Sequence, residues 1–136
     1  MTDIYSPFHA AAKIAPEPAD RDNATREAWI RHYAALALAS WVVFHDVITR
    51  RNTNPQPDDL PDISFLAVIG SSSTAAAIAL THPDDAPTLI WDYTPEAGAL
   101  NGEWEDWLED VLVRHGINPA HIDHRRDAGD FTPTAA

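Results

Sequence analysis

The sequence predicts one α+β domain, built from a long central helix, a three-stranded antiparallel β-meander and a second amphipathic helix. Residues 25–50 and 103–115 repeat apolar side chains at helical spacing. Residues 63–93 instead contain apolar runs of strand length, separated by turn residues. The expected order is therefore α-β-β-β-α, followed by a short C-terminal helical turn. A chain of 136 residues is long enough to bury a core as a single domain.

The predicted domain is flanked by two segments of different composition. Residues 1–22 are rich in proline and alanine and predict an extended N-terminal arm, in which one short helical turn is possible near residues 8–14. Residues 23–126 carry the periodic segments and predict the folded domain, and residues 127–136 predict a flexible tail. The arm has no basic region followed by an apolar core, so it is not a secretory signal, and we expect a cytoplasmic location.

The long helix over residues 25–50 is apolar on almost every side. A stripe at helical spacing predicts a face against the core, but Leu38 and Val42 lie on the far side. A helix of this kind is normally covered on more than one side. We favour cover by the chain's own sheet and arm, and the alternative is a homodimer seam. A membrane span is rejected because Arg31, His32, His45 and Asp46 interrupt the apolar run.

The three expected strands are residues 63–69, 74–82 and 88–93. The sequence Gly70-Ser-Ser-Ser-Thr74 is interpreted as the hairpin turn between the first two. A second interpretation stays open, in which 63–69 is a strand and 74–82 a helix whose first amides face a phosphate. That loop lacks the lysine and second glycine of the stronger nucleotide motif, so the meander is preferred.

The second helix, residues 103–115, has an apolar stripe and an acidic opposite side. Gly116 follows it at the position where a left-handed residue commonly ends a helix. Asn118 and Pro119 then predict the start of a short helix over residues 119–125. The stripe consists of Trp104, Trp107, Leu108, Val111 and Leu112.

The net charge of −12 is concentrated in the middle of the chain. Residues 52–113 contain twelve acids and no lysine or arginine, whereas the two ends together carry nine acids and nine bases. Nucleic acid is a poor partner for such a segment, because its affinity comes largely from basic groups that displace counterions. Anionic membrane surfaces are disfavoured for the same reason. A basic protein partner is compatible with this charge.

Two sets of residues are candidates for a site. Histidines 115, 121 and 124, grouped with the carboxylate of Asp123, are weak candidates for a metal site, since a polar C-terminal surface explains them as well. No catalytic residue is predicted: the chain has no cysteine and no Gly-x-Ser-x-Gly elbow, and its carboxylates are expected to be exposed. No cofactor is predicted either. The candidate partner-binding residues are the acids Asp84, Asp85, Asp92, Glu105, Asp106 and Glu109.

These observations favour a small acidic protein-binding or inhibitory module. It would engage a basic protein partner through the acidic middle segment and the 103–115 helix. Two alternatives stay open. One is a small metal-dependent or acid–base enzyme that uses the histidine-rich C-terminal segment, although an enzyme is the less favoured class. The other is a structural homo-oligomer, for example a homodimer, built on residues 25–50.

Overall fold

The computed structural model describes residues 4–53, 62–85 and 103–124, and the side chains of all of these except 51–53 and 103–105. Every regular element within them is helical, so the α+β prediction is wrong. The expected third strand, residues 88–93, lies outside the described residues. The elements are the helices α1 (Ser6–Ile14), α2 (Arg26–Thr53), α3 (Ile63–Thr81) and α6 (Glu103–Arg114), and the short 3-10 helix η1 (Pro119–His121).

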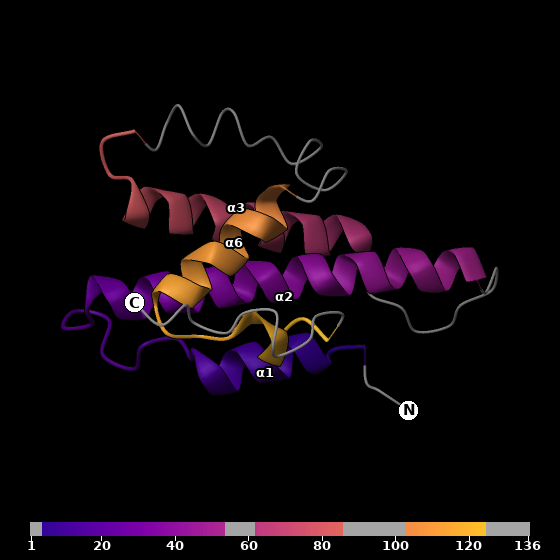
Figure 1. The fold of residues 1–136 in the computed structure, drawn as a ribbon, viewed down its shortest axis with the longest axis horizontal. Coiled ribbons are helices and arrows are strands. Elements are labelled where there is room, and N and C mark those ends of the chain that lie inside the picture. The colour runs from indigo at the N-terminus through magenta and orange to yellow at the C-terminus, as the bar shows by residue number, and fades with distance from the viewer. Residues whose placement is uncertain (1–3, 54–61, 86–102, 125–136) are drawn as a thin grey trace.

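Helix α2 is the central element, and it contacts α1, α3 and α6. Figure 1 shows α3 running antiparallel along α2, α1 lying along another side of α2, and α6 crossing α2 at an angle. The most extensive of these contacts is the one between α2 and α3. The protein is therefore organised around one long helix that other helices cover.

The all-round burial of α2 follows from its sequence. Residues 37–43 are all buried, and seven consecutive residues include every face of a helix. Leu38 and Val42, the residues that would have formed a dimer seam, are both fully buried inside the single chain. The expectation that the chain covers its own long helix therefore holds for these two side chains, but helices provide the cover where a sheet was predicted.

Helix α3 replaces the first two predicted strands. Its start is capped by the carboxylate of Asp62, which accepts a hydrogen bond of 2.9 Å from the amide of Ser64. The predicted turn continues the helix: Gly70 is buried in its middle, and the hydroxyl of Thr74 donates to the carbonyl oxygen of Gly70 at 2.7 Å. Both earlier interpretations of residues 70–74, the hairpin turn and the phosphate loop, are wrong because no strand precedes them and no helix begins there.

Among the described residues, α3 is the one helix whose length and composition would allow it to cross a membrane. Its 19 residues carry no charge, and its most apolar window has a mean hydropathy of 1.8. A core helix of a globular protein meets the same criterion, and α3 packs along α2 through Leu66, Gly70, Thr74 and Ile78. About a third of that window is buried. Length and composition alone therefore do not identify α3 as a membrane-spanning helix.

The arm that precedes α2 contains the helix α1, which overlaps the helical turn considered near residues 8–14 and is longer than one turn. The Nδ1 atom of His32 on α2 lies 3.1 Å from the carbonyl oxygen of Ala15, which can only accept, so His32 donates and fixes the end of α1. In the following turn the side chain of Asn23 donates to Asp20 at 2.8 Å. This hydrogen bond lowers the pKa of the exposed Asp20 carboxyl below its ordinary value.

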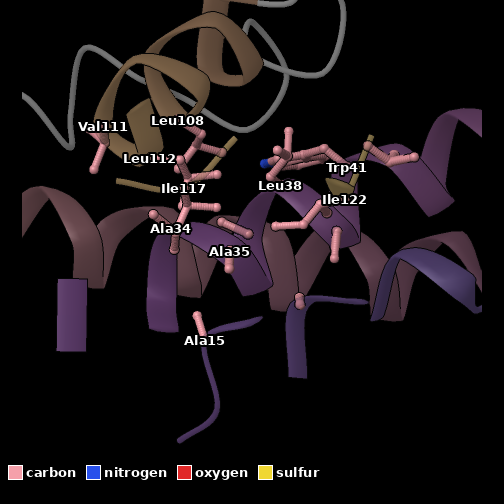
Figure 2. Close-up of a cluster of buried hydrophobic side chains, with 14 of the residues drawn as sticks. Ala15, Ala34, Ala35, Leu38, Trp41, Leu108, Val111, Leu112, Ile117 and Ile122 are labelled. Carbon is pink, nitrogen blue, oxygen red and sulfur yellow. The ribbon is translucent and has the colours of Figure 1, made fainter. Parts of the chain in front are cut away.

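The chain turns back onto the core after α6. Gly116 has a φ of +82°, the left-handed conformation that glycine adopts without strain, as the sequence predicted. The short helix that follows is η1, which ends at His121, before the expected end at residue 125. Figure 2 shows Ile117 and Ile122 near the side chains that α6 and α2 place in the core. This return packs the residues after α6 onto the body of the protein.

Candidate functional site

The six acids proposed for partner binding fall into three groups. Asp84 and Asp85 are exposed in the turn that follows α3, and Asp106 is exposed on α6. Glu109 is buried, with only 5 % of its surface exposed. Asp92 and the side chain of Glu105 lie outside the described residues. We define the acidic surface as Asp84, Asp85 and Asp106.

The burial of Glu109 corrects the expectation that the helix acids all face solvent. Glu109 lies between Leu108 and Leu112 on α6, next to the face that both leucines bury against α2. A helical wheel of α6 alone gives no sign that Glu109 is covered. Glu109 is therefore unavailable to a partner in this conformation.

One contact joins the two parts of the acidic surface. The ring of His82, at the end of α3, lies 6.5 Å from the ring of Trp107 on α6. Asp84 and Asp85 follow His82 directly, and Asp106 precedes Trp107. The turn after α3 is therefore held beside α6. Neither Asp84 nor Asp85 has an ion-pair partner in the part of the chain that the structure describes.

A cleft of about 300 Å³ lies between the start of α2, the end of α3 and α6. Its floor is apolar and comes from all three helices, through Ile30, Leu80 and Val111. Trp107 and His82 line it together. The other polar residues that line it are Arg26, Thr81, Asp110, Arg114 and His115.

The cleft carries more positive than negative groups, in contrast to the whole chain. Its one carboxylate, Asp110, pairs with Arg114 at 3.0 Å one helical turn away. Both side chains of this pair are more than half exposed, so it adds little stability. Arg26 has no ion pair among the described residues. Arg26 and His82 are not among the predicted site residues. Arg26 stands at the expected start of the long helix and could have been noted there, whereas His82 ends a segment that was expected to be a strand.

The three histidines proposed as weak metal candidates lie in different places. His115 lines the cleft, and His121 is exposed in η1. His124 forms a 2.8 Å ion pair with Asp46 of α2 when its ring is protonated. No group of three or more His, Asp or Glu side chains suited to a metal ion occurs within residues 4–50, 62–85 and 106–124. The structure does not bring these histidines together.

Asp123 is the one carboxylate grouped with the candidate metal-binding histidines. It is completely buried next to the exposed His124. Its backbone amide donates to the carbonyl oxygen of Pro119 at 2.8 Å, which fixes the chain after η1. Burial of a carboxylate requires compensating interactions, and Asp123 has such partners. We interpret it as a structural anchor of the C-terminal segment.

A second surface is apolar. Phe65 and Val68 of α3 are 63 % and 61 % exposed, unusual values for large apolar side chains on a helix that packs in a core. Phe65 and Ile69 line a groove of about 540 Å³ together with Tyr5 and Phe8 near the start of α1. Nothing among the described residues indicates what covers this groove.

Comparison with protein-family models, with curated proteins and with solved structures finds no match for this chain. Function must therefore be argued from the residues of the site alone.

Proposed function

We propose that this protein is a small acidic module that binds a basic protein partner through the acidic surface. One observation carries the proposal: Asp84 and Asp85 are adjacent and exposed, and neither has an ion-pair partner among the described residues. Two neighbouring carboxylates repel each other, and a cationic partner would relieve that repulsion. A partner with lysine or arginine side chains fits this chemistry.

The surroundings of the aspartates support the same proposal. No lysine or arginine occurs within residues 52–113, and no described base forms an ion pair with Asp84 or Asp85. The ring contact between His82 and Trp107 holds the turn beside α6, so a partner would meet carboxylates from two elements. A surface of one sign chiefly accelerates association with a partner of the opposite sign. We expect binding that weakens steeply as salt is added.

The two alternative functions receive less support from the described residues. An enzyme based on His115, His121 and His124 would need these side chains to act together, and they lie in three different places. A homo-oligomer built on α2 would need residues other than Leu38 and Val42, because both are buried within the chain. We therefore retain the binding module as the proposed function.

The experiment compares three forms of the protein as bait in a lysate of the source organism. The forms are the parent, Asp84→Asn with Asp85→Asn, and a matched control, Asp58→Asn with Asp59→Asn. The control removes an equal number of identical charges from the other Asp-Asp pair of the base-free segment. Quantitative mass spectrometry at low and high salt identifies what each form retains.

We expect the parent and the control to retain the same basic protein at low salt. The Asp84→Asn, Asp85→Asn form should lose it, and high salt should release it from every form. Equal retention by all three forms contradicts the proposal, as does the absence of any basic protein from the parent at low salt. Circular dichroism of the three forms verifies that each is folded.

A further inference from the structure

The cleft between the start of α2, the end of α3 and α6 is not explained by the acidic surface beside it. Its lining includes two arginines and two histidines but only one carboxylate. That carboxylate, Asp110, is already paired with Arg114. The chain as a whole has a net charge of −12, so a pocket with more basic than acidic groups is not expected from the composition of the protein.

The charge of Arg26 is the central feature of this cleft. Three of the described arginines, Arg21, Arg31 and Arg114, each pair with an acid four residues earlier in the chain. Arg26 has no such pair among the described residues, and it lines the cleft. It is also the first residue of α2, at the end of a helix where the partial charge is positive. Both features favour an anion in the cleft.

The remaining lining indicates the shape of the ligand. Trp107 provides an aromatic surface, and Ile30, Leu80 and Val111 provide an apolar floor. Small-molecule sites commonly combine such apolar walls with a few polar groups that fix orientation. His82 and His115 lie among the same lining residues and can donate hydrogen bonds to anionic oxygens. A volume of about 300 Å³ suits a ligand of a few carbon atoms with one charged group.

We propose that this cleft binds a small ligand that carries an anionic carboxylate or phosphate group attached to a flat apolar part. The anionic group lies against Arg26 and the histidines, and the flat part lies against Trp107. This site is separate from the proposed protein-binding function. Binding here requires no partner protein and does not involve Asp84 or Asp85.

Four probe compounds test the two parts of the ligand separately. Benzoate and phenyl phosphate carry both an anionic group and a flat ring, whereas benzyl alcohol has only the ring and inorganic phosphate only the charge. Titration followed through the imidazole NMR signals of His82 and His115 gives the dissociation constant of each. We expect millimolar binding of benzoate or phenyl phosphate, with the tighter of the two identifying carboxylate or phosphate as the natural group. Benzyl alcohol and inorganic phosphate should bind at least about tenfold more weakly.

A pair of variants locates the anionic group. Arg26→Gln removes the charge from the cleft and should weaken the tighter probe by about tenfold, because a charge-assisted hydrogen bond is lost. Arg21→Gln removes the same charge from an arginine that does not line the cleft, and it should change the dissociation constant little. Both arginines are exposed, so both variants should fold.

Three results would overturn the proposal. The first is binding of benzyl alcohol as tight as that of the charged ring compounds. The second is no binding of either charged ring compound at millimolar concentration. The third is an equal effect of Arg26→Gln and Arg21→Gln. The Asp84→Asn, Asp85→Asn form should bind the probes at least as well as the parent. The probe titrations and the lysate experiment therefore test the two proposals independently. Either proposal can fail while the other stands.

Discussion

The indole ring of Trp41 lies so close to Gly70 that the glycine has no room for a side chain. A Cβ atom placed on Gly70 would lie 2.7 Å from Cε2 and 2.9 Å from Cζ2 of Trp41. The indole Nε1 donates to the hydroxyl of Thr74 one turn further along α3, at 3.4 Å. Trp41 is only 1 % exposed, so the ring cannot move away. This contact fixes the distance between α2 and α3.

Gly70→Ala should therefore destabilise the protein. Alanine in the middle of a helix gains about 1 kcal/mol over glycine. Overpacking a rigid core costs about 1–3 kcal/mol, which outweighs that gain. We expect a net loss of up to about 2 kcal/mol in the free energy of unfolding, measured by denaturant titration.

Ser72→Ala is the matched control for this change. Ser72 is exposed on the same helix, so the substitution meets no neighbour. It should leave stability unchanged or raise it by up to about 0.5 kcal/mol, through helix propensity alone. A stabilised Gly70→Ala protein would show that α2 and α3 do not approach each other as closely as the structure has them.

Leu38 tests whether α2 is covered within one chain. Its side chain is fully buried, so Leu38→Glu would place an unpaired charge in the core. We expect loss of the cooperative thermal transition in circular dichroism. Ala28→Glu, in the first turn of α2 where negative charge is favourable, should stay folded. A folded Leu38→Glu protein that elutes as a monomer while the parent elutes as a dimer would instead identify a dimer seam.

Two consecutive residues of α6 face different surroundings: Leu108 lies in the core, and Trp107 lines the cleft. Leu108 is fully buried, so Leu108→Ala should cost about 2–5 kcal/mol of stability. Trp107 is half-buried against His82 and lines the cleft. We expect Trp107→Ala to cost less than Leu108→Ala in the same denaturant titration. The reverse order would mean that Trp107 is the main anchor of α6.

The two helices with a clear apolar stripe could be predicted from the sequence. Helices were expected over residues 25–50 and 103–115, and α2 and α6 lie there. Gly116 also has the conformation that its position predicted. These elements could be predicted because long periodic segments with suitable ends distinguish a helix from a strand.

Helix α3 could not be predicted in this way. The run of residues 63–69 is short and continuously apolar, and such a run suits a buried strand as well as a buried helix. Gly70 and its serines looked like a turn, but the glycine is required by the nearby Trp41, a residue 29 positions away that no local pattern reveals. Thr74 and Thr81 satisfy their hydroxyls on the carbonyl oxygens of their own helix. The Asp62 cap is a local signal of a helix start, but it directly follows a stretch rich in proline and aspartate that is equally typical of a loop.

The candidate site could be predicted only in part. The exposure of Asp84, Asp85 and Asp106 agrees with their polar surroundings in the sequence. The burial of Glu109 and the cleft around Arg26 depend on how α6 and the end of α3 meet α2, which is tertiary information. Composition indicates that the protein surface is negatively charged overall, but it cannot indicate where basic side chains lie close together on that surface.

The association rate constant of the captured basic protein tests the proposed function most directly. Stopped-flow measurements would compare the parent with the Asp84→Asn, Asp85→Asn form over a range of ionic strength. We predict that the variant associates at least about tenfold more slowly at low salt and loses much of its salt dependence. The Asp58→Asn, Asp59→Asn control should stay close to the parent. An Asp84→Asn, Asp85→Asn form that associates as fast as the parent at low salt would contradict the proposal that this surface binds the partner.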